Sequence, residues 1–263
     1  MNTISSSNLN FVYFNFKIMN KEFWMKRKLP APERLHLILM LTLTFSTGVV
    51  DAVGYLGLDR VFTGNMTGNV VVLGMALAGG ANLPVLRPAL ALLGFMLGAA
   101  IAGRLLRKEP PGWCHRTSGA FLVVAVGLSA IALFTFLVPG GDKDAAGTAV
   151  TTVLAVLMGI QAATARRLKV TDVTTVVVTS TITALASESR LAGGTSKFWV
   201  RRALAIALIL LGAVAGGTVL HWHLWLGLAL SAALTTAVVA IGHARYRHDG
   251  TLARLSELQT AGS

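Results

Sequence analysis

Six long apolar runs divide this chain, and each is long enough to cross a membrane as a helix. The runs lie near residues 36–57, 85–106, 119–139, 147–166, 199–220 and 222–243. A helix needs roughly 17–25 apolar residues to span the hydrocarbon core of a bilayer. Only 13% of the residues are charged, against about 25% in a typical soluble domain. The sequence therefore predicts an all-α, polytopic membrane helix bundle with the lipid bilayer as its partner.

The basic residues gather in clusters between the apolar runs and give a formal net charge of +12. A strongly basic chain can bind nucleic acid through one positive face, but these clusters follow no single face. They have the pattern that cytoplasmic loops show in membrane proteins, so we expect no nucleic-acid partner. Cys114 is the only cysteine, which excludes a disulfide framework and a cysteine metal cluster.

Two shorter segments of mixed character interrupt the series of long runs. One reads VFTGNMTGNVVVLGMALAGG from Val61 to Gly80, and the other reads VTDVTTVVVTSTITALASES from Val170 to Ser189. Both are apolar overall but carry clustered polar residues. Short, interrupted apolar segments at matching places in two halves of a chain point to a solute site in a transporter.

The distribution of Lys and Arg indicates whether these two segments, near 62–80 and 171–187, cross the membrane. If all eight segments cross, 15 Lys and Arg residues lie inside and 8 outside. If the two segments return to the side they entered from, 20 lie inside and 3 outside. Because cytoplasmic loops carry the excess of positive charge, we predict six crossings and two re-entrant or broken helices. Both termini are then cytoplasmic.

The chain divides into a membrane domain over residues 35–245 and two tails. Residues 1–34 are rich in Asn and Ser and predict a disordered cytoplasmic tail, within which Met19 and Met25 are alternative start positions. Residues 246–263 predict a second cytoplasmic tail. Within the membrane domain, we expect one repeat over about 36–140 and a second over about 147–245.

Three short matches in the same order support this internal repeat. The matched pairs are Gly48 with Gly159, Thr63 with Thr175, and the runs LGAAIAG from Leu97 and LGAVAGG from Leu211. Their offsets are 111, 112 and 114 residues. Since each half has three crossings, the second half starts on the opposite side, and the repeat is predicted to be inverted. The small residues of the two runs, four apart, let helix backbones approach closely, and we expect them to bring the second and fifth crossings together.

Candidate site residues follow from polar groups in or beside the apolar segments. Asp51 lies in the first crossing, where an ionisable group costs about 2.5 kcal/mol or more and is a functional-site hypothesis by default. It is either a cation or proton site, or a structural carboxylate capped by the N–H groups of the following segment. The other candidates for solute binding are Thr63, Asn65, Thr67, Asn69, Gln161, Asp172, Thr174, Thr175, Thr179 and Thr181. Their hydroxyl and amide groups donate and accept hydrogen bonds, but they can equally satisfy the backbone at a helix break.

The two motif regions carry a family resemblance. GVVDAVGYLGLDRVFTGNMTGNVVVLGMAL, followed later by MGIQAATARRLKVTDVTTVVVTSTITALA, resembles the YoaK-like family of bacterial integral membrane proteins, whose function is unknown. The resemblance covers roughly residues 36–245. Ser180 and Ala184 stand where the family tends to have Gly. The resemblance implies a multi-pass protein of the bacterial inner membrane and carries over no activity.

The sequence therefore favours a transporter or channel for a small solute or ion, with its site between the two polar segments. A non-transporting membrane scaffold or regulator is the alternative. We expect no enzymatic activity, because no nucleophile and base converge, and no cofactor or metal. The sequence is compatible with a homo-oligomer as well as with a monomer.

Overall fold

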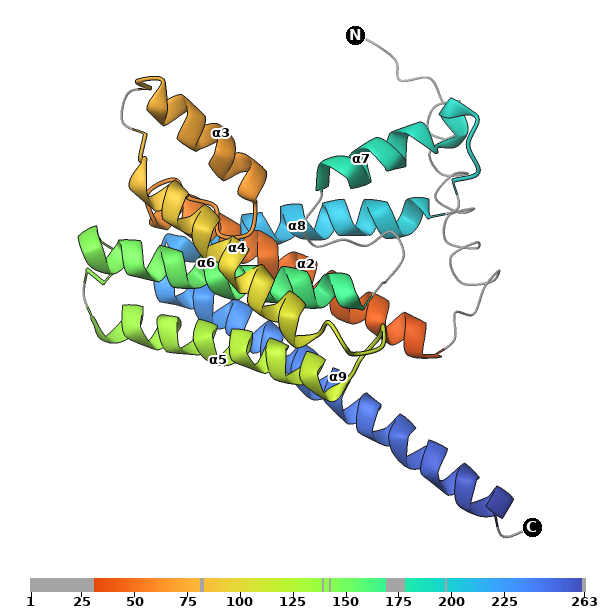
Figure 1. Cartoon of the computed structure of the whole chain (residues 1–263). Helices are drawn as coiled ribbons and strands as arrows, with labels where there is room; N and C mark the ends of the chain where they lie inside the picture. Colours follow the sequence, from red (N-terminus) through yellow and green to blue (C-terminus); the bar gives the residue numbers. More distant parts are fainter. Residues whose placement is uncertain are drawn as a thin grey trace.

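A computed structural model describes residues 31–80, 83–138, 140–141, 143–168, 178–196 and 198–261. Every regular element in this part of the chain is a helix (Figure 1). The helices are α2 Ala31–Gly57, α3 Met66–Leu77, α4 Leu86–Leu105, α5 His115–Leu137, α6 Asp144–Arg167, α7 Val178–Ser187, the 3₁₀ turn η1 Arg190–Ala192, α8 Trp199–Leu220 and α9 Leu224–Ala261. Most of the predicted N-terminal tail lies outside the described residues.

Six of these helices are long and apolar enough to cross a membrane, which confirms the predicted polytopic bundle. They are α2, α4, α5, α6, α8 and α9. Each corresponds to one of the six apolar runs, because a run of this length satisfies its backbone within lipid only by forming a helix. The apolar span of α9 ends at Asp249, and the helix itself continues to Ala261.

The other two helices are too short to cross. α3 has 12 residues and α7 has 10, so they are about 18 Å and about 15 Å long, whereas the hydrocarbon core is about 30 Å thick. In Figure 1, α3 starts near the middle of the bundle and ends beside the start of α4. α7 also starts near the middle but ends at the opposite end of the bundle, beside the start of α8. The six long helices are those that the sequence predicts, and the return of the two short segments to the side from which they enter stays a prediction.

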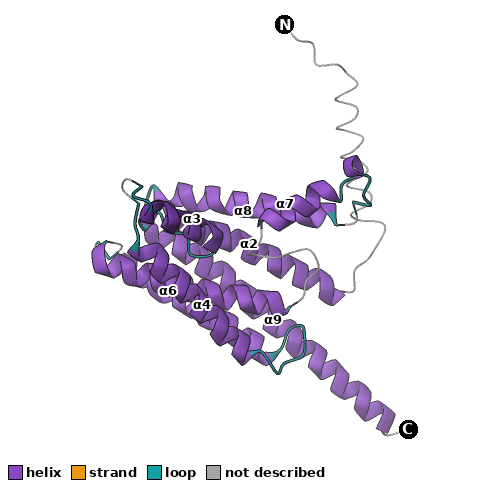
Figure 2. Ribbon diagram, turned by 45° about the horizontal axis from the view of Figure 1, so that its top comes forward, coloured by secondary structure: helices purple, strands orange, loops and turns teal. Residues whose placement is uncertain are grey.

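The long helices pack in three main pairs: α2 with α8, α4 with α6, and α5 with α9. The two short helices lie on one flank of this bundle, α3 against α4 and α7 against α8 (Figure 2). If α2 corresponds to α6 and α4 to α8 in an inverted duplication, then the contact of α2 with α8 in one half corresponds to the contact of α6 with α4 in the other, as is seen here. The duplication itself stays a prediction.

The small-residue motifs join different helices from those expected. A Cβ atom on Gly98 of α4 would clash with the carbonyl oxygen of Val156 in α6, and one on Gly212 of α8 would clash with that of Phe45 in α2. The expectation that the second and fifth crossings meet is therefore wrong. Four-residue spacing makes one helix face smooth, but it carries no information on which helix packs there.

α2 is the most enclosed of the six crossings. Within its apolar window 72% of the residues are buried, whereas the corresponding share in α8 is 17%. Exposed side chains on α8, including Leu210, Leu211 and Val214, form an apolar face of the kind that lipid covers. A polar side chain on the inner side of α2 therefore lies among protein atoms.

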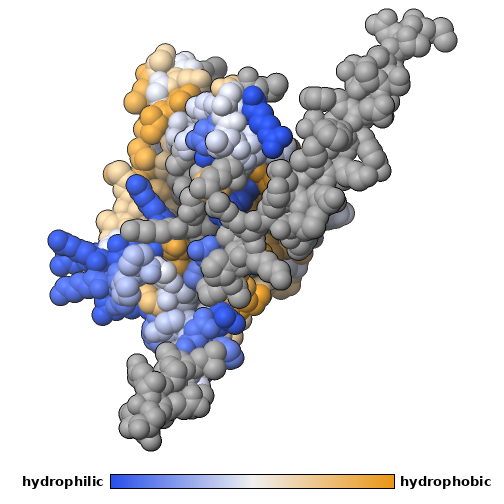
Figure 3. Space-filling view, turned by 90° about the vertical axis from the view of Figure 1, so that its right-hand side faces the viewer, coloured by the Kyte–Doolittle hydropathy of each residue, from blue (hydrophilic) through white to orange (hydrophobic). Residues whose placement is uncertain are grey.

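The two ends of the bundle differ in charge. Figure 3 looks onto the end where α2 starts and α4 and α6 finish, and hydrophilic side chains gather over it. The α4–α5 loop and the C-terminus of α6 supply Arg107, Lys108 and Arg167 there. The loops at the opposite end contain Arg60 and Lys143.

Candidate functional site

The chain reverses direction directly after α2. Asp59 and Arg60 have φ angles of 63° and 58°, a left-handed conformation that costs energy in residues other than glycine. This turn sends the following residues back along α2, where Val61 and Thr63 are fully buried. α3 then begins inside the bundle, at the level of Asp51.

The carboxylate of Asp51 holds the start of α3. Its Oδ1 atom accepts hydrogen bonds from the backbone N–H groups of Thr63, Gly64 and Asn65, at N···O distances of 3.0, 2.6 and 3.3 Å. N–H groups at the start of a helix lack partners within it and carry partial positive charge. Asp51 supplies an acceptor and the opposite charge, as its structural interpretation predicts. Its second oxygen, Oδ2, accepts none of these three backbone hydrogen bonds.

The two asparagines of the first segment serve the same local fold. The Oδ1 atom of Asn65 accepts from the N–H of Gly68 at 3.2 Å and caps α3. The Nδ2 atom of Asn69 donates to the carbonyl oxygen of Phe62 at 2.6 Å, and its Oδ1 accepts from the N–H of Phe62 at 2.9 Å. Thr67 is exposed. These three candidates thus make local contacts or face outward.

Five buried residues from α2, α6 and the segment before α3 form what we call the core polar cluster: Thr47, Asp51, Thr63, Gly64 and Gln161. A Cβ atom on Gly64 would lie 3.1 Å from Thr47 Cγ2 and 3.4 Å from each carboxylate oxygen of Asp51. Gln161 reaches the cluster from α6, where its Nε2 donates to Thr47 Oγ1 at 3.2 Å. Three predicted site residues, Asp51, Thr63 and Gln161, therefore lie in one cluster.

Two oxygens of the core polar cluster have no hydrogen-bond partner within the described part of the chain. They are Thr63 Oγ1 and Gln161 Oε1. Leaving a buried polar group unpaired costs about 1–3 kcal/mol, and Gln161 is only 1% exposed. Unsatisfied buried oxygens of this kind indicate where a bound ligand or an ordered water completes a structure.

Thr47 is a member of the cluster that sequence reasoning missed. The available signal was its spacing, because Thr44, Thr47 and Asp51 recur at i, i+3 and i+7 and so share one face of α2. Both threonine hydroxyls donate to the backbone four residues earlier, Thr44 to Met40 at 3.0 Å and Thr47 to Leu43 at 2.9 Å. A threonine with this local bond resembles an apolar residue, which is why its place in the cluster was not evident from the sequence.

The second polar segment is described only in part. Asp172, Thr174 and Thr175 lie outside the described residues. In α7, Thr179 is exposed and Thr181 is buried, and the helix packs against α8. The roles predicted for these five residues in solute binding stay predictions.

The buried Arg202 of α8 holds the C-terminal half of α7. One of its guanidinium nitrogens, Nη1, donates to the carbonyl oxygen of Ala184 at 3.0 Å and pairs with the Glu188 carboxylate at 2.8 Å. A cation near a helix C-terminus is favourable because of the partial negative charge there. Arg202 therefore has a clear structural role in fixing α7 to α8.

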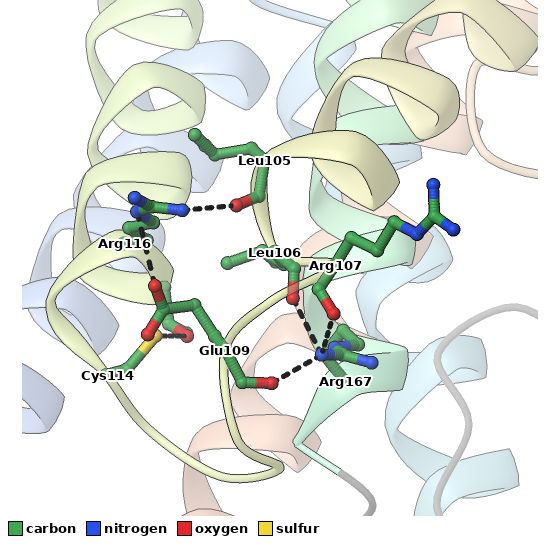
Figure 4. Close-up of polar contacts among 8 residues, drawn as sticks. Leu105, Leu106, Arg107, Glu109, Cys114, Arg116 and Arg167 are labelled. Atoms are coloured by element: carbon green, nitrogen blue, oxygen red, sulfur yellow. Dashed lines mark hydrogen bonds and ion pairs between the residues drawn. The ribbon is translucent and has the colours of Figure 1, made fainter.

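The basic loop after α4 is also fixed by arginine (Figure 4). Nη2 of Arg167, at the end of α6, donates to the carbonyl oxygens of Leu106 and Glu109, each at 2.6 Å, and lies 3.4 Å from that of Arg107. Arg116 donates to the carbonyl oxygen of Leu105 at 3.1 Å and pairs with the Glu109 carboxylate at 3.2 Å. These arginines close the end of the bundle and lie apart from the core polar cluster.

Comparisons with known proteins agree with the resemblance seen in the motifs. A family model described as "Protein of unknown function (DUF1275)" matches residues 39–241. The chain is 32% identical over 213 residues to the UPF0700 transmembrane protein YoaK of Bacillus subtilis (strain 168), which covers 76% of this chain and 92% of that relative. No solved structure matches. The predicted membership of a YoaK-like family of unknown function is confirmed.

Proposed function

We propose that this chain, which belongs to the DUF1275 family of membrane proteins of unknown function, transports or conducts a small solute or ion through the core polar cluster. The observation that carries the proposal is the pair of unsatisfied oxygens beside a buried carboxylate in the most enclosed crossing. Ionisable groups inside membrane helices are rare and mark solute or proton pathways. A helix that starts inside the bilayer next to such a group is typical of transporters.

The depth of the cluster supports this proposal. Asp51 lies six residues, and Thr47 ten residues, before the end of α2 at Gly57, which places them about 9 Å and about 15 Å along the helix from that end. Gln161 approaches from α6, six residues before its end at Arg167. α2 and α6 finish at opposite ends of the bundle (Figure 1). The cluster therefore lies inside the bundle, away from both of its ends.

The proposed location is a bacterial inner membrane with both termini in the cytoplasm. The support is the division of Lys and Arg into 20 on the side of the termini and 3 on the other, which follows the positive-inside rule.

A flux assay in proteoliposomes tests transport. Wild-type protein is compared with Gln161→Leu and with the control Thr151→Val, which removes a fully buried hydroxyl that donates to the carbonyl oxygen of Gly147 in its own helix. We expect flux of at least one solute or ion in a broad panel, its loss in Gln161→Leu, and wild-type flux in the control. Equal and background flux in all three proteins would reject the proposal.

A non-transporting scaffold or regulator is the second candidate. The observation that favours it is that Asp51 Oδ1, Asn65 Oδ1 and the Asn69 amide all hold residues 62–69 in place. Under this alternative, Gln161→Leu alters stability or the recovery of a cross-linked partner and leaves permeability at the level of empty vesicles.

A further inference from the structure

Most hydrogen-bond donors of the core polar cluster are already committed, the exceptions being the hydroxyl of Thr63 and the second N–H of Gln161 Nε2. The three backbone N–H groups before α3, which would otherwise form an anion site, all donate to Asp51 Oδ1. The hydroxyl hydrogen of Thr47 goes to the carbonyl oxygen of Leu43. Because that hydrogen is used, Thr47 Oγ1 can only accept from Gln161, which fixes the amide with Nε2 toward Thr47 and Oε1 free. An anionic solute would find few donors here.

Apart from these two donors, the groups that remain are oxygen lone pairs. They belong to Asp51 Oδ2, Gln161 Oε1, Thr63 Oγ1 and the second lone pair of Thr47 Oγ1. Carboxylate, amide and hydroxyl oxygens are the ligands that hard metal cations take in proteins. The side chains come from three separate parts of the chain. A Cβ atom on Gly64 would lie 3.1 Å from Thr47 Cγ2 and 3.4 Å from each carboxylate oxygen of Asp51, so the absence of a side chain lets this backbone pass close to the carboxylate. Gln161 is joined to the same group of residues by its hydrogen bond to Thr47.

The charge of the cluster sets the valence of its ligand. Asp51 is its only ionisable residue, so one monovalent cation makes the cluster neutral. Calcium sites in proteins typically use several carboxylates, and no group of three or more His, Cys, Asp or Glu residues comes together in the part of the chain that the structure describes. We infer that the core polar cluster binds a monovalent metal cation through oxygen atoms of Asp51, Thr47, Thr63 and Gln161. This cation is the substrate or the coupling ion of the transporter, and in that respect the inference rests on the proposed function.

Equilibrium binding of radioactive Na⁺ to the purified full-length protein in lipid nanodiscs tests this inference. We expect saturable binding near one ion per chain, with K⁺, Li⁺ and choline as competitors to rank selectivity. Thr47→Val and Gln161→Leu each remove one oxygen ligand while keeping a similar shape, and each should weaken binding about tenfold. The control Thr151→Val removes a buried hydroxyl outside the cluster and should bind as the wild type does.

Folding of each variant is checked separately by its elution volume and thermal unfolding in choline chloride. Because Asp51 also holds α3, the neutral replacements at Thr47 and Gln161 carry the test. Absence of saturable Na⁺, K⁺ and Li⁺ binding to the folded wild type would overturn the inference. So would binding that both variants leave unchanged, or uptake that a proton gradient drives in the absence of all three ions.

The outcomes also separate this inference from the transport proposal. Saturable cation binding that depends on Thr47 and Gln161, with no flux in vesicles, leaves the site standing and rejects transport. Flux of a solute that is independent of Na⁺, K⁺ and Li⁺, with no binding of any of them, leaves transport standing and rejects the cation site.

Discussion

Single residues in the first polar segment have separable tasks. Asn65 and Asn69 satisfy backbone groups of residues 62–68, whereas Gln161 has an oxygen without a partner among the residues that the structure describes. The sequence predicted that these residues matter, because polar side chains in apolar segments are costly. It did not separate the structural ones from those available to a ligand, since both kinds are the same residue types at similar spacing.

Substitution of Asp51 should expose its structural task. In Asp51→Ala, three N–H groups lose their acceptor, so we expect a loss of about 1–3 kcal/mol in stability. Asp51→Asn keeps one acceptor oxygen and should lose less. Thermal unfolding in detergent measures both changes. Asp59→Asn is the control, because asparagine tolerates the left-handed φ of 63° at this position and the change removes only the charge of a half-exposed 3.8 Å ion pair with Arg87, a kind of pair that contributes about 0–1 kcal/mol. Equal effects of Asp51→Ala and Asp59→Asn would contradict the assignment.

At the level of elements, the sequence predicted the crossings well and their neighbours poorly. Length and apolarity fix each crossing, because lipid demands a complete helix. The start of α3 was also foreseeable, since Asn65 is a good N-cap residue. The helices that pack against α4 and α8 could not be predicted, because a glycine such as Gly98 or Gly212 allows any helix backbone to approach closely. Only the three-dimensional packing distinguishes Val156 and Phe45 as their contacts.

Gly98→Ala tests the close approach of α4 and α6. The added Cβ would meet backbone atoms of Val156, which can yield only by separating the helices, and we expect a loss of about 1–3 kcal/mol. Gly103→Ala is a matched control in the same helix, where a Cβ meets nothing within 4 Å. It should be neutral or more stable by about 0.5–1 kcal/mol, because alanine suits a helix better than glycine. Thermal unfolding of both variants decides, and an unchanged Gly98→Ala protein would argue against the packing.

Cysteine labelling tests whether α3 and α7 return to opposite membrane faces. Single cysteines replace the exposed Ala78 and Ser187 in a Cys114→Ser background. We expect an impermeant thiol reagent to label position 78 only from outside the cell and position 187 only from the cytoplasm. Labelling of position 78 from the cytoplasm would mean that α3 crosses the membrane.

The whole molecule is a bundle with one strongly basic end. That end was predictable, because Lys and Arg between apolar runs follow the orientation of the chain. The arginine contacts that close it were not, since Arg167 and the loop carbonyl of Leu106 lie 61 residues apart. The positions of Lys and Arg in the sequence thus indicated the side of the membrane. They did not indicate the hydrogen bonds by which Arg167 fixes the loop.

Reporter fusions test the orientation of the whole molecule. A phosphatase that folds only outside the cytoplasm should be inactive when fused after Ser263 and active when fused after Leu137. A fluorescent protein that folds only in the cytoplasm should give the reverse result at both positions. Phosphatase activity at the C-terminus would contradict the proposed orientation.

The bond between Asp51 and the start of α3 also has a consequence for how the protein is made. α2 leaves the ribosome before residues 63–65 do, so its carboxylate enters the insertion machinery without the amides that later neutralise it. A newly made α2 is therefore an incomplete membrane helix, and its release into lipid is costly until the next hairpin has been synthesised. We expect α2, the reversing turn and α3 to leave the translocon as one unit, and a nascent chain stopped before residue 62 to remain beside it.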